Sequence, residues 1–170
     1  DAVFHTDAVQ GFLKVPFSAK TLGADLISVS SHKIHGPKGC GTLYISPRLK
    51  SFPALLQGGG QEGGYRSGTE ATPAIFGFAA ACAATDAQQE IARMTDLRDY
   101  CRARAQEIPG LVLIGQQAAP HIVNLSLPGL RSQGIINCLQ TKGIYVSAGS
   151  ACSKGHRSYV LEAMRLPPAV

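Results

Sequence analysis

Lys33 is the first residue of the chain whose position suggests chemistry. It follows the apolar segment 26–30 and is preceded by Ser30, Ser31 and His32. A charged amine is costly to bury without a partner, and burial lowers the pKa of a lysine amine. A lysine with a lowered pKa is suited to Schiff-base formation. A lysine at a strand end is more often an ordinary surface residue, so Lys33 needs a second observation.

Asp7 supplies that second observation. Residues 3–4 predict a first strand that ends in the polar residues 5–7. A pyridine cofactor bound through a lysine needs a carboxylate beside its ring nitrogen, which keeps that nitrogen protonated as an electron sink. Ser30 and His32 are suited to hold the phosphate of such a cofactor.

Cys152 is the second residue with a chemical signature. It lies in the segment 148–155, which is built mainly of Gly, Ser and Ala and is therefore sterically open and able to move. The neighbouring Lys154, His156 and Arg157 favour the thiolate, which is the reactive form of cysteine. We therefore expect Cys152 to be a nucleophile.

The other cysteines have a structural interpretation. Cysteine behaves as a small apolar residue and is often buried. We expect this of Cys40, Cys82, Cys101 and Cys138.

Two competing interpretations of the lysine segment are weaker. Residues 36–41 are glycine-rich, but no Lys-Ser/Thr pair closes them as in a nucleotide phosphate loop, so we expect a turn. His32, His35 and Cys40 are three residues of types that bind zinc, but the set lacks a convincing fourth ligand, so we expect no metal site.

The elements that position these residues follow from the apolar pattern. The first strand, a short helix at residues 18–23 and a second strand at residues 26–30 form a βαβ-like unit. Ligands of such sheets lie at the carboxyl ends of the strands, so both polar clusters point into one crevice. Residues 57–69 form a long glycine-rich loop of the kind that is usually functional or disordered.

The rest of the chain predicts a long helix and a small α+β unit. Thr72-Pro73 is typical of a helix start, and a single helix is expected from Ala74 to Ile108. The other expected elements are strands at 41–46, 121–127 and 144–147 and helices at 132–141 and 157–164.

Composition and charge limit the classes of function. The 170 residues, 45% hydrophobic and 16% charged, suit one folded domain or two incomplete ones. The net charge of +5 is dispersed among acidic residues, which argues against nucleic-acid binding. We expect neither a membrane span nor a signal peptide, and the start without Met suggests a piece of a longer protein. The odd number of cysteines without a CxxC pair favours a reducing compartment, which we take to be the cytoplasm.

Several segments together resemble the cysteine desulfurases, which are fold-type I enzymes dependent on pyridoxal 5′-phosphate (PLP). The resemblance runs almost end to end, and its segments follow one another in the family's order. They are HTDAVQ at 5–10, SSHKIHGPKG at 30–39, GGGQE at 58–62, RSGT at 66–69, HIVNLS at 121–126 and SAGSAC at 147–152.

The resemblance implies a role for each residue of the cofactor site. Lys33 would bind PLP covalently and later move protons. Asp7 would pair with the pyridinium nitrogen, and Gln10 would hydrogen-bond the phenolic oxygen. Ser30 and His32 would hold the phosphate.

The resemblance also implies sulfur chemistry and a dimer. Cys152 would take sulfur from cofactor-bound L-cysteine, which leaves L-alanine and a persulfide for an acceptor such as an iron–sulfur scaffold protein. Thr69 would reach the phosphate of the partner subunit's cofactor in a homodimer.

The implied fold is α/β and incomplete. Residues 1–89 would be part of the large PLP-binding domain, and residues 90–170 would be part of a small α+β C-terminal domain reached through the long helix. The family's ring-stacking histidine, threonine-bearing phosphate loop and substrate-binding arginine have no match here. We therefore expect the chain alone to bind PLP poorly and to turn over slowly or not at all.

Other functions remain open from the sequence. A selenocysteine lyase is barely separated from a desulfurase. A plain aminotransferase is disfavoured, because its chemistry needs no cysteine on a Gly-Ser loop. From a different class, a non-catalytic remnant that binds a partner or carries sulfur would be expected to have lost some of the site residues.

Overall fold

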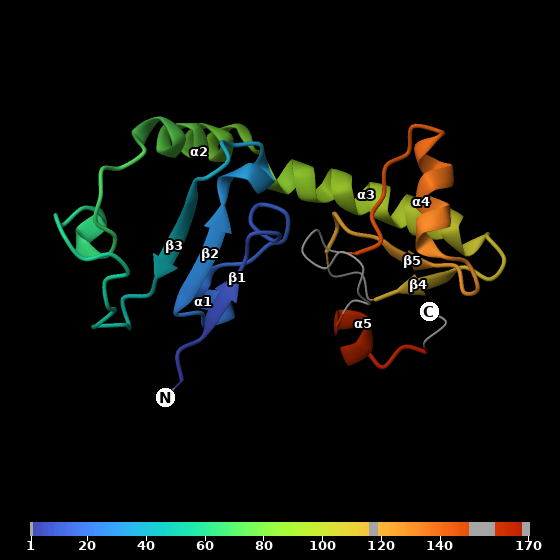
Figure 1. Cartoon of the computed structure of the whole chain (residues 1–170), viewed down its shortest axis with the longest axis horizontal. Coiled ribbons are helices and arrows are strands. Elements are labelled where there is room, and N and C mark those ends of the chain that lie inside the picture. The colour runs from blue at the N-terminus through green and yellow to red at the C-terminus, as the bar shows by residue number, and fades with distance from the viewer. Residues whose placement is uncertain (1, 116–118, 150–158, 168–170) are drawn as a thin grey trace. The chain divides into compact units, whose positions relative to one another are not determined.

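The computed structural model describes residues 2–115, 119–149 and 159–167, which form two compact units (Figure 1). The first unit comprises residues 1–95 with 119–121, and the second comprises residues 96–118 with 122–170. The candidate cofactor residues all lie in the first unit. Cys152 belongs to the second unit and lies outside the described residues.

A three-stranded sheet organises the first unit. It consists of β1 (His5–Asp7), β2 (Leu26–Ser30) and β3 (Gly41–Ile45) in the order β1-β2-β3. The first two strands are parallel, and β3 runs antiparallel to β2. This confirms the predicted strand–helix–strand unit, although β1 begins at His5 rather than at Val3 and includes the polar residues expected to follow it.

The crossover between the parallel strands contains α1 (Ala19–Leu22). Ser18 caps it, since its side chain accepts a hydrogen bond from the backbone N–H of Thr21, and the Thr21 side chain accepts one from the backbone N–H of Ser18. The helix ends at Gly23, whose φ of 64° is the left-handed conformation that glycine adopts without strain. The predicted helix at 18–23 is therefore confirmed.

A small apolar cluster packs the sheet against its crossover, and an ion pair joins Asp25, just before β2, to Arg48 after β3. Ala8, Ala24 and Ile27 are buried, with Phe17, Ala19 and Val29 packed against them. Asp25 is 2% exposed, and it accepts hydrogen bonds from Nε of Arg48 (2.7 Å) and from the backbone N–H of Phe4 (2.9 Å). Arg48 thereby holds the pKa of the Asp25 carboxyl below its ordinary value, with a further contribution from the Phe4 N–H.

The expected helix 74–108 is wrong as a single element. The chain forms α2 (Thr72–Ala84) and α3 (Ala87–Gln106), separated by Thr85 and Asp86. Thr85 has extended backbone angles (φ −95°, ψ 110°), and Oδ1 of Asp86 accepts a hydrogen bond from the backbone N–H of Gln89 (3.1 Å). Asp86 thus caps a new helix, which the continuous helix-forming composition had hidden. At the other end of α2 the N-cap is Ala71, not Thr72.

The second unit contains a two-stranded antiparallel sheet and short helices. β4 (Val112–Ile114) pairs with β5 (Asn124–Ser126), and α4 (Ser132–Gln140) and α5 (Tyr159–Ala163) follow. The sequence did not predict β4, and β5 is shorter than the expected strand 121–127. Residues 144–147 form no strand, which corrects that expectation.

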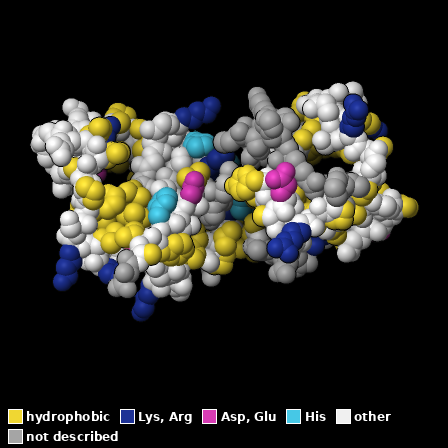
Figure 2. All heavy atoms as spheres, turned by 60° about the horizontal axis from the view of Figure 1, so that its bottom comes forward, with side chains coloured by type: hydrophobic (Ala, Val, Ile, Leu, Met, Phe, Trp, Pro, Cys, Tyr) yellow, Lys and Arg dark blue, Asp and Glu magenta, His cyan; other side chains and the backbone are white. Residues whose placement is uncertain are grey.

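No helix among the described residues is long and apolar enough to cross a membrane. On the face drawn in Figure 2, Lys and Arg side chains lie singly rather than in one patch.

Candidate active site

The carboxyl ends of β1 and β2 lie at the same edge of the sheet, because these strands are parallel. Asp7 lies level with Ser28, and the ladder continues through a hydrogen bond from the Ala8 N–H to the Ser28 carbonyl (2.9 Å). The Asp7 side chain is exposed at this edge, and its Oδ1 accepts a hydrogen bond from the Val9 N–H (2.9 Å). A carboxylate is therefore held in a defined orientation at the strand end.

The end of β2 leads directly into a short 3₁₀ helix, η1 (Ser31–Ile34), that carries Lys33. Oγ of Ser30 and Nδ1 of His32 form a hydrogen bond of 2.7 Å, which orients the exposed imidazole. Lys33 itself is half-buried. Asp7, Ser30, His32 and Lys33 thus follow or end two neighbouring parallel strands, as the sequence predicted.

His5 and Ser28 add a polar pair that the sequence reasoning missed. Nε2 of His5 and Oγ of Ser28 form a hydrogen bond of 2.9 Å between β1 and β2. Side chains two residues apart lie on the same face of a strand, so His5 shares a face with Asp7 and Ser28 shares one with Ser30. This period of two was readable in the sequence and could have pointed to the pair.

Gln10 and Thr69 are both exposed in the first unit. Gln10 lies in the turn after β1, where the Phe12 N–H donates to the Ala8 carbonyl (2.8 Å). Thr69 is the last residue of the glycine-rich loop, which contains the 3₁₀ turn η2 (Glu62–Gly64). Both side chains are therefore accessible to a bound molecule.

The glycine-rich loop has internal order. The Leu55 N–H donates to the Tyr65 carbonyl (2.9 Å), and the Ser67 N–H donates to the Leu56 carbonyl (3.0 Å). Oε1 of Gln61 accepts a hydrogen bond from the Gly68 N–H (3.2 Å). The two arms of the loop are therefore tied together just before Thr69.

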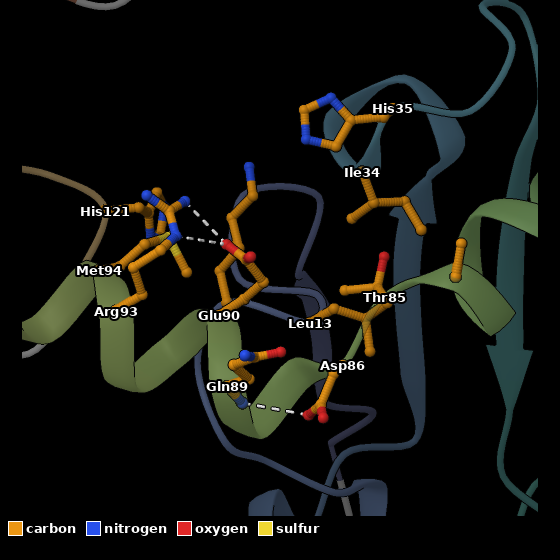
Figure 3. Close-up of a pocket in the computed structure, with 12 residues that line it drawn as sticks. Leu13, Ile34, His35, Thr85, Asp86, Gln89, Glu90, Arg93, Met94 and His121 are labelled. Atoms are coloured by element: carbon orange, nitrogen blue, oxygen red, sulfur yellow. Dashed lines mark hydrogen bonds and ion pairs between the residues drawn. The ribbon is translucent and has the colours of Figure 1, made fainter.

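A cavity of about 520 Å³ in the first unit borders the lysine segment through Ile34 and His35 (Figure 3). Burial lowers the pKa of Lys14, which lines this cavity, and repulsion from Lys33 lowers it further. Burial and then Lys14 lower the pKa of His121, whose two ring nitrogens are buried without a hydrogen-bond partner among the described residues. The sequence did not single out Lys14, because its position in the turn after β1 carries no motif.

The start of α3 lines the same cavity. Asp86, Gln89, Glu90, Arg93 and Met94 contribute to its wall, and Arg93 donates to Oε2 of Glu90 (2.8 Å from Nη2). Figure 3 shows this pair pointing toward each other. The cavity wall therefore carries charges of both signs.

The cysteines differ in part from the expectation. Cys40 and Cys82 are half-buried, and burial raises the pKa of the Cys82 thiol. Cys101 and Cys138 are exposed, so the core interpretation of these two is wrong. Both lie on solvent-exposed helix surfaces, in α3 and α4.

Among the described residues, no group of three or more His, Cys, Asp or Glu side chains is arranged to hold a metal ion.

The fold of the chain matches solved NifS-like proteins, which are α/β enzymes of the fold-type I PLP-dependent class. A NifS-like protein from Rickettsia africae superposes with a TM-score of 0.81 at 29% identity, over 98% of this chain and 45% of that chain. A second NifS-like protein superposes with a TM-score of 0.80 at 35% identity, over 98% of this chain and 44% of that chain.

The chain belongs to the class-V aminotransferase family, whose model matches residues 1–166. A cysteine desulfurase from Enterobacter agglomerans is 40% identical over 97% of this chain, and the cysteine desulfurase IscS from Dictyoglomus turgidum is 40% identical over 98% of it. The matches cover only 42% and 44% of these relatives, so the chain spans less than half their length.

Proposed function

We propose that this chain carries the cofactor lysine and the sulfur-accepting cysteine of a PLP-dependent cysteine desulfurase, which converts L-cysteine to L-alanine. The observation that carries the proposal is the parallel pairing of β1 and β2, which puts Asp7 and the segment 30–33 at one sheet edge. The cysteine desulfurases at 40% identity support the same reaction. A related solved structure, described as SspA in complex with cysteine, superposes with a TM-score of 0.70.

The donors present at the sheet edge fit PLP. Lys33 would hold the cofactor covalently and move protons, and Asp7 would face the ring nitrogen. Ser30 and His32 would bind the phosphate, and their mutual hydrogen bond of 2.7 Å supports an oriented pair of donors. When bound, PLP supplies an electron sink for the pair of electrons released at the substrate.

Two further residues complete the proposed cofactor site. Gln10 would hydrogen-bond the phenolic oxygen from the turn after β1. Thr69 would reach the phosphate of the partner subunit's cofactor, so a homodimer is part of the proposal.

Cys152 would perform the sulfur step. Its thiolate would attack the sulfur of L-cysteine, so that an S–S bond forms and the substrate C–S bond breaks. The electron pair of the broken bond stays with the substrate carbon, which takes a proton to give L-alanine. The sulfur remains on Cys152 as a persulfide and would pass to an acceptor such as an iron–sulfur scaffold protein in the cytoplasm.

The proposed division of the chain follows these roles. Residues 1–89 belong to the PLP-binding large domain, and residues 90–170 belong to a small C-terminal domain that carries Cys152.

A visible absorption spectrum of the purified chain mixed with PLP tests the cofactor site. A band that is present in the wild type and in Lys38→Ala, but lost in Lys33→Ala, is the expected result. Lys38 is a matched control because it is an exposed lysine just after the same turn. A band that persists in Lys33→Ala would contradict the cofactor role of Lys33. No band in the wild type would mean that this chain does not hold PLP by itself, and the desulfurase assignment would then describe the longer protein rather than this chain.

Product assays then test the sulfur step. Cys152→Ser should abolish sulfide and alanine formation from cysteine while it leaves the absorption band. Alanine formed from selenocysteine but not from cysteine would instead make the chain a selenocysteine lyase. An intact band without either reaction would fit both an incomplete desulfurase, which is expected to turn over slowly or not at all, and a non-catalytic remnant.

A further inference from the structure

The residues that follow β2 form a closed turn around Lys33. We call residues 31–37 the lysine turn. Its first N–H, from Ser31, donates to the Cys40 carbonyl (3.0 Å), and the Gly36 N–H donates to the Ser31 carbonyl (3.0 Å). Ser31 is fully buried, and a Cβ on Gly36 would overlap its Oγ. The turn therefore has little room for rearrangement from within.

Helix α2 packs closely against the lysine turn at Gly77. The helix contacts η1 (Figure 1), and a Cβ placed on Gly77 would lie 2.6 Å from Cγ and 3.0 Å from Cδ of Pro37. Real Cβ atoms do not approach other atoms so closely, and a proline ring cannot rotate away as a flexible side chain can. Gly77 lies within α2 and has no positive φ, so only the space beside Pro37 requires glycine there.

The next residue of α2 reaches the other half of the candidate site. Phe78 is 8% exposed and packs edge-to-face on Phe12, with ring centroids 6.2 Å apart. Phe12 lies in the turn after β1 that also carries Gln10. Neighbouring residues of one helix thus contact both loops that follow the parallel strands.

We propose that Gly77 is a positioning residue: it lets α2 seat on Pro37 and so fixes the lysine turn, and with it Lys33, relative to the loop after β1. The proposal deepens the proposed function, because Lys33 is the cofactor lysine there. The proposal can be tested without PLP, because it concerns the exposure and order of the lysine turn in the free chain.

The test compares Gly77→Ala with Gly134→Ala in the full chain. Gly134 is a matched control because it is also a helix glycine, in α4, and a Cβ there meets nothing within 4 Å. We expect Gly77→Ala to speed amide hydrogen exchange of Ser31 and Gly36 about tenfold, and acetylation of Lys33 relative to Lys20 and Lys50 roughly threefold. Gly134→Ala should leave both rates unchanged.

A second substitution separates local seating from general damage. Pro37→Ala removes the ring atoms that the added methyl group would meet, so Gly77→Ala should change the Lys33 acetylation rate much less in the Pro37→Ala background. If Gly77→Ala alone does not fold, the double variant with Pro37→Ala should fold, and that result would support the proposal in the same way. Equal effects in both backgrounds, or exchange that rises uniformly over the whole chain, would overturn the proposal.

The acetylation test gives an answer whether or not the chain binds PLP. Acetylation of Lys33 in the free chain reports on the position of the turn even if PLP gives no absorption band. If the band forms, Gly77→Ala should weaken PLP binding and Pro37→Ala should partly restore it.

Discussion

Helices α2 and α3 follow each other in the chain but are held in place by different means. α2 has no charged residue and is apolar on all sides, and its contacts to the lysine turn and to Phe12 are close and shape-dependent. α3 is mostly polar, and its described side-chain contacts include the ion pairs Arg93–Glu90 (2.8 Å) and Arg104–Glu107 (2.6 Å). Close apolar contacts therefore dominate in α2, whereas α3 combines a side-chain cap and ion pairs with the buried residues Arg98 and Ala105.

This difference shows which helix governs the site. Close packing penalises a change of even one methyl group, whereas exposed ion pairs contribute little to stability. Substitutions in α2 should consequently disturb the lysine turn, which carries Lys33, and the turn after β1, which carries Gln10. Substitutions on the exposed face of α3 should leave them intact.

The largest expected effect is from Phe78→Ala. Loss of a buried phenyl ring costs about 3–5 kcal/mol in well-packed cores. Ile75 and Phe76 on the same helix are exposed, so the core around Phe78 is incompletely packed, and we expect the lower value of about 3 kcal/mol. Urea unfolding of the variant measures it. Leu97→Ala in α3 is the control, since Leu97 is 55% exposed and should change stability by less than about 0.5 kcal/mol. Equal losses in the two variants would remove the distinction between the helices.

Asp86→Ala should have the next largest effect. The substitution removes the side-chain acceptor for the Gln89 N–H, and loss of such an N-cap costs about 1 kcal/mol. Asp86→Asn and Asp86→Ser keep an acceptor and should recover most of the loss in the same unfolding assay. If Asp86→Ala left the stability unchanged, the boundary between the helices would depend on Thr85 or on packing instead.

The helix break shows where sequence reasoning succeeds and fails. The parallel β1–β2 pair followed from apolar segments that end in polar residues, and the structure confirmed it. Residues 74–108 contain no proline or glycine at the break, and the only sequence signal there is Asp86 followed three residues later by Gln89, a pattern found at helix starts. The interruption comes from a side-chain cap at Asp86, which a pattern of apolar residues does not reveal.

The candidate site was predictable to the same extent. Asp7, Ser30, His32 and Lys33 were found because strand ends and motifs mark them. Gly77 and Pro37 were not, because their importance arises from a contact between segments 40 residues apart in the sequence. Lys14 and His121 were missed likewise, since only the folded chain places them on one cavity.

Protonation of His121, which lines the cavity beside the start of α3, should make the free energy of unfolding depend on pH. Its pKa is lowered in the folded chain by burial and then by Lys14, so the unfolded chain binds more protons below pH about 6.5. The free energy of unfolding is therefore highest above that pH, and it decreases as the pH falls toward the lowered pKa that His121 has in the folded chain. Glu90 on the same cavity is paired with Arg93 and offers limited compensation.

His121→Gln tests this dependence. The variant should have a flatter stability profile between pH 7 and pH 5 than the wild type, measured by urea unfolding at each pH (roughly the range in which histidine titrates). His35→Gln is the control, because His35 lines the same cavity but is exposed. An unchanged slope in His121→Gln would show that another group titrates there.

The smallest expected effect is from Glu90→Gln on α3. Glu90 and Arg93 form an exposed pair, with side chains 43% and 58% exposed, and such pairs three residues apart on a helix contribute about 0.3 kcal/mol. The loss should shrink further in 0.5 M salt (a Debye length of roughly 4 Å), because ions screen exposed charges. A loss above about 1 kcal/mol that persists in salt would mean that the pair is structurally important to the cavity wall. In that case surface charge would fix α3 as firmly as packing fixes α2.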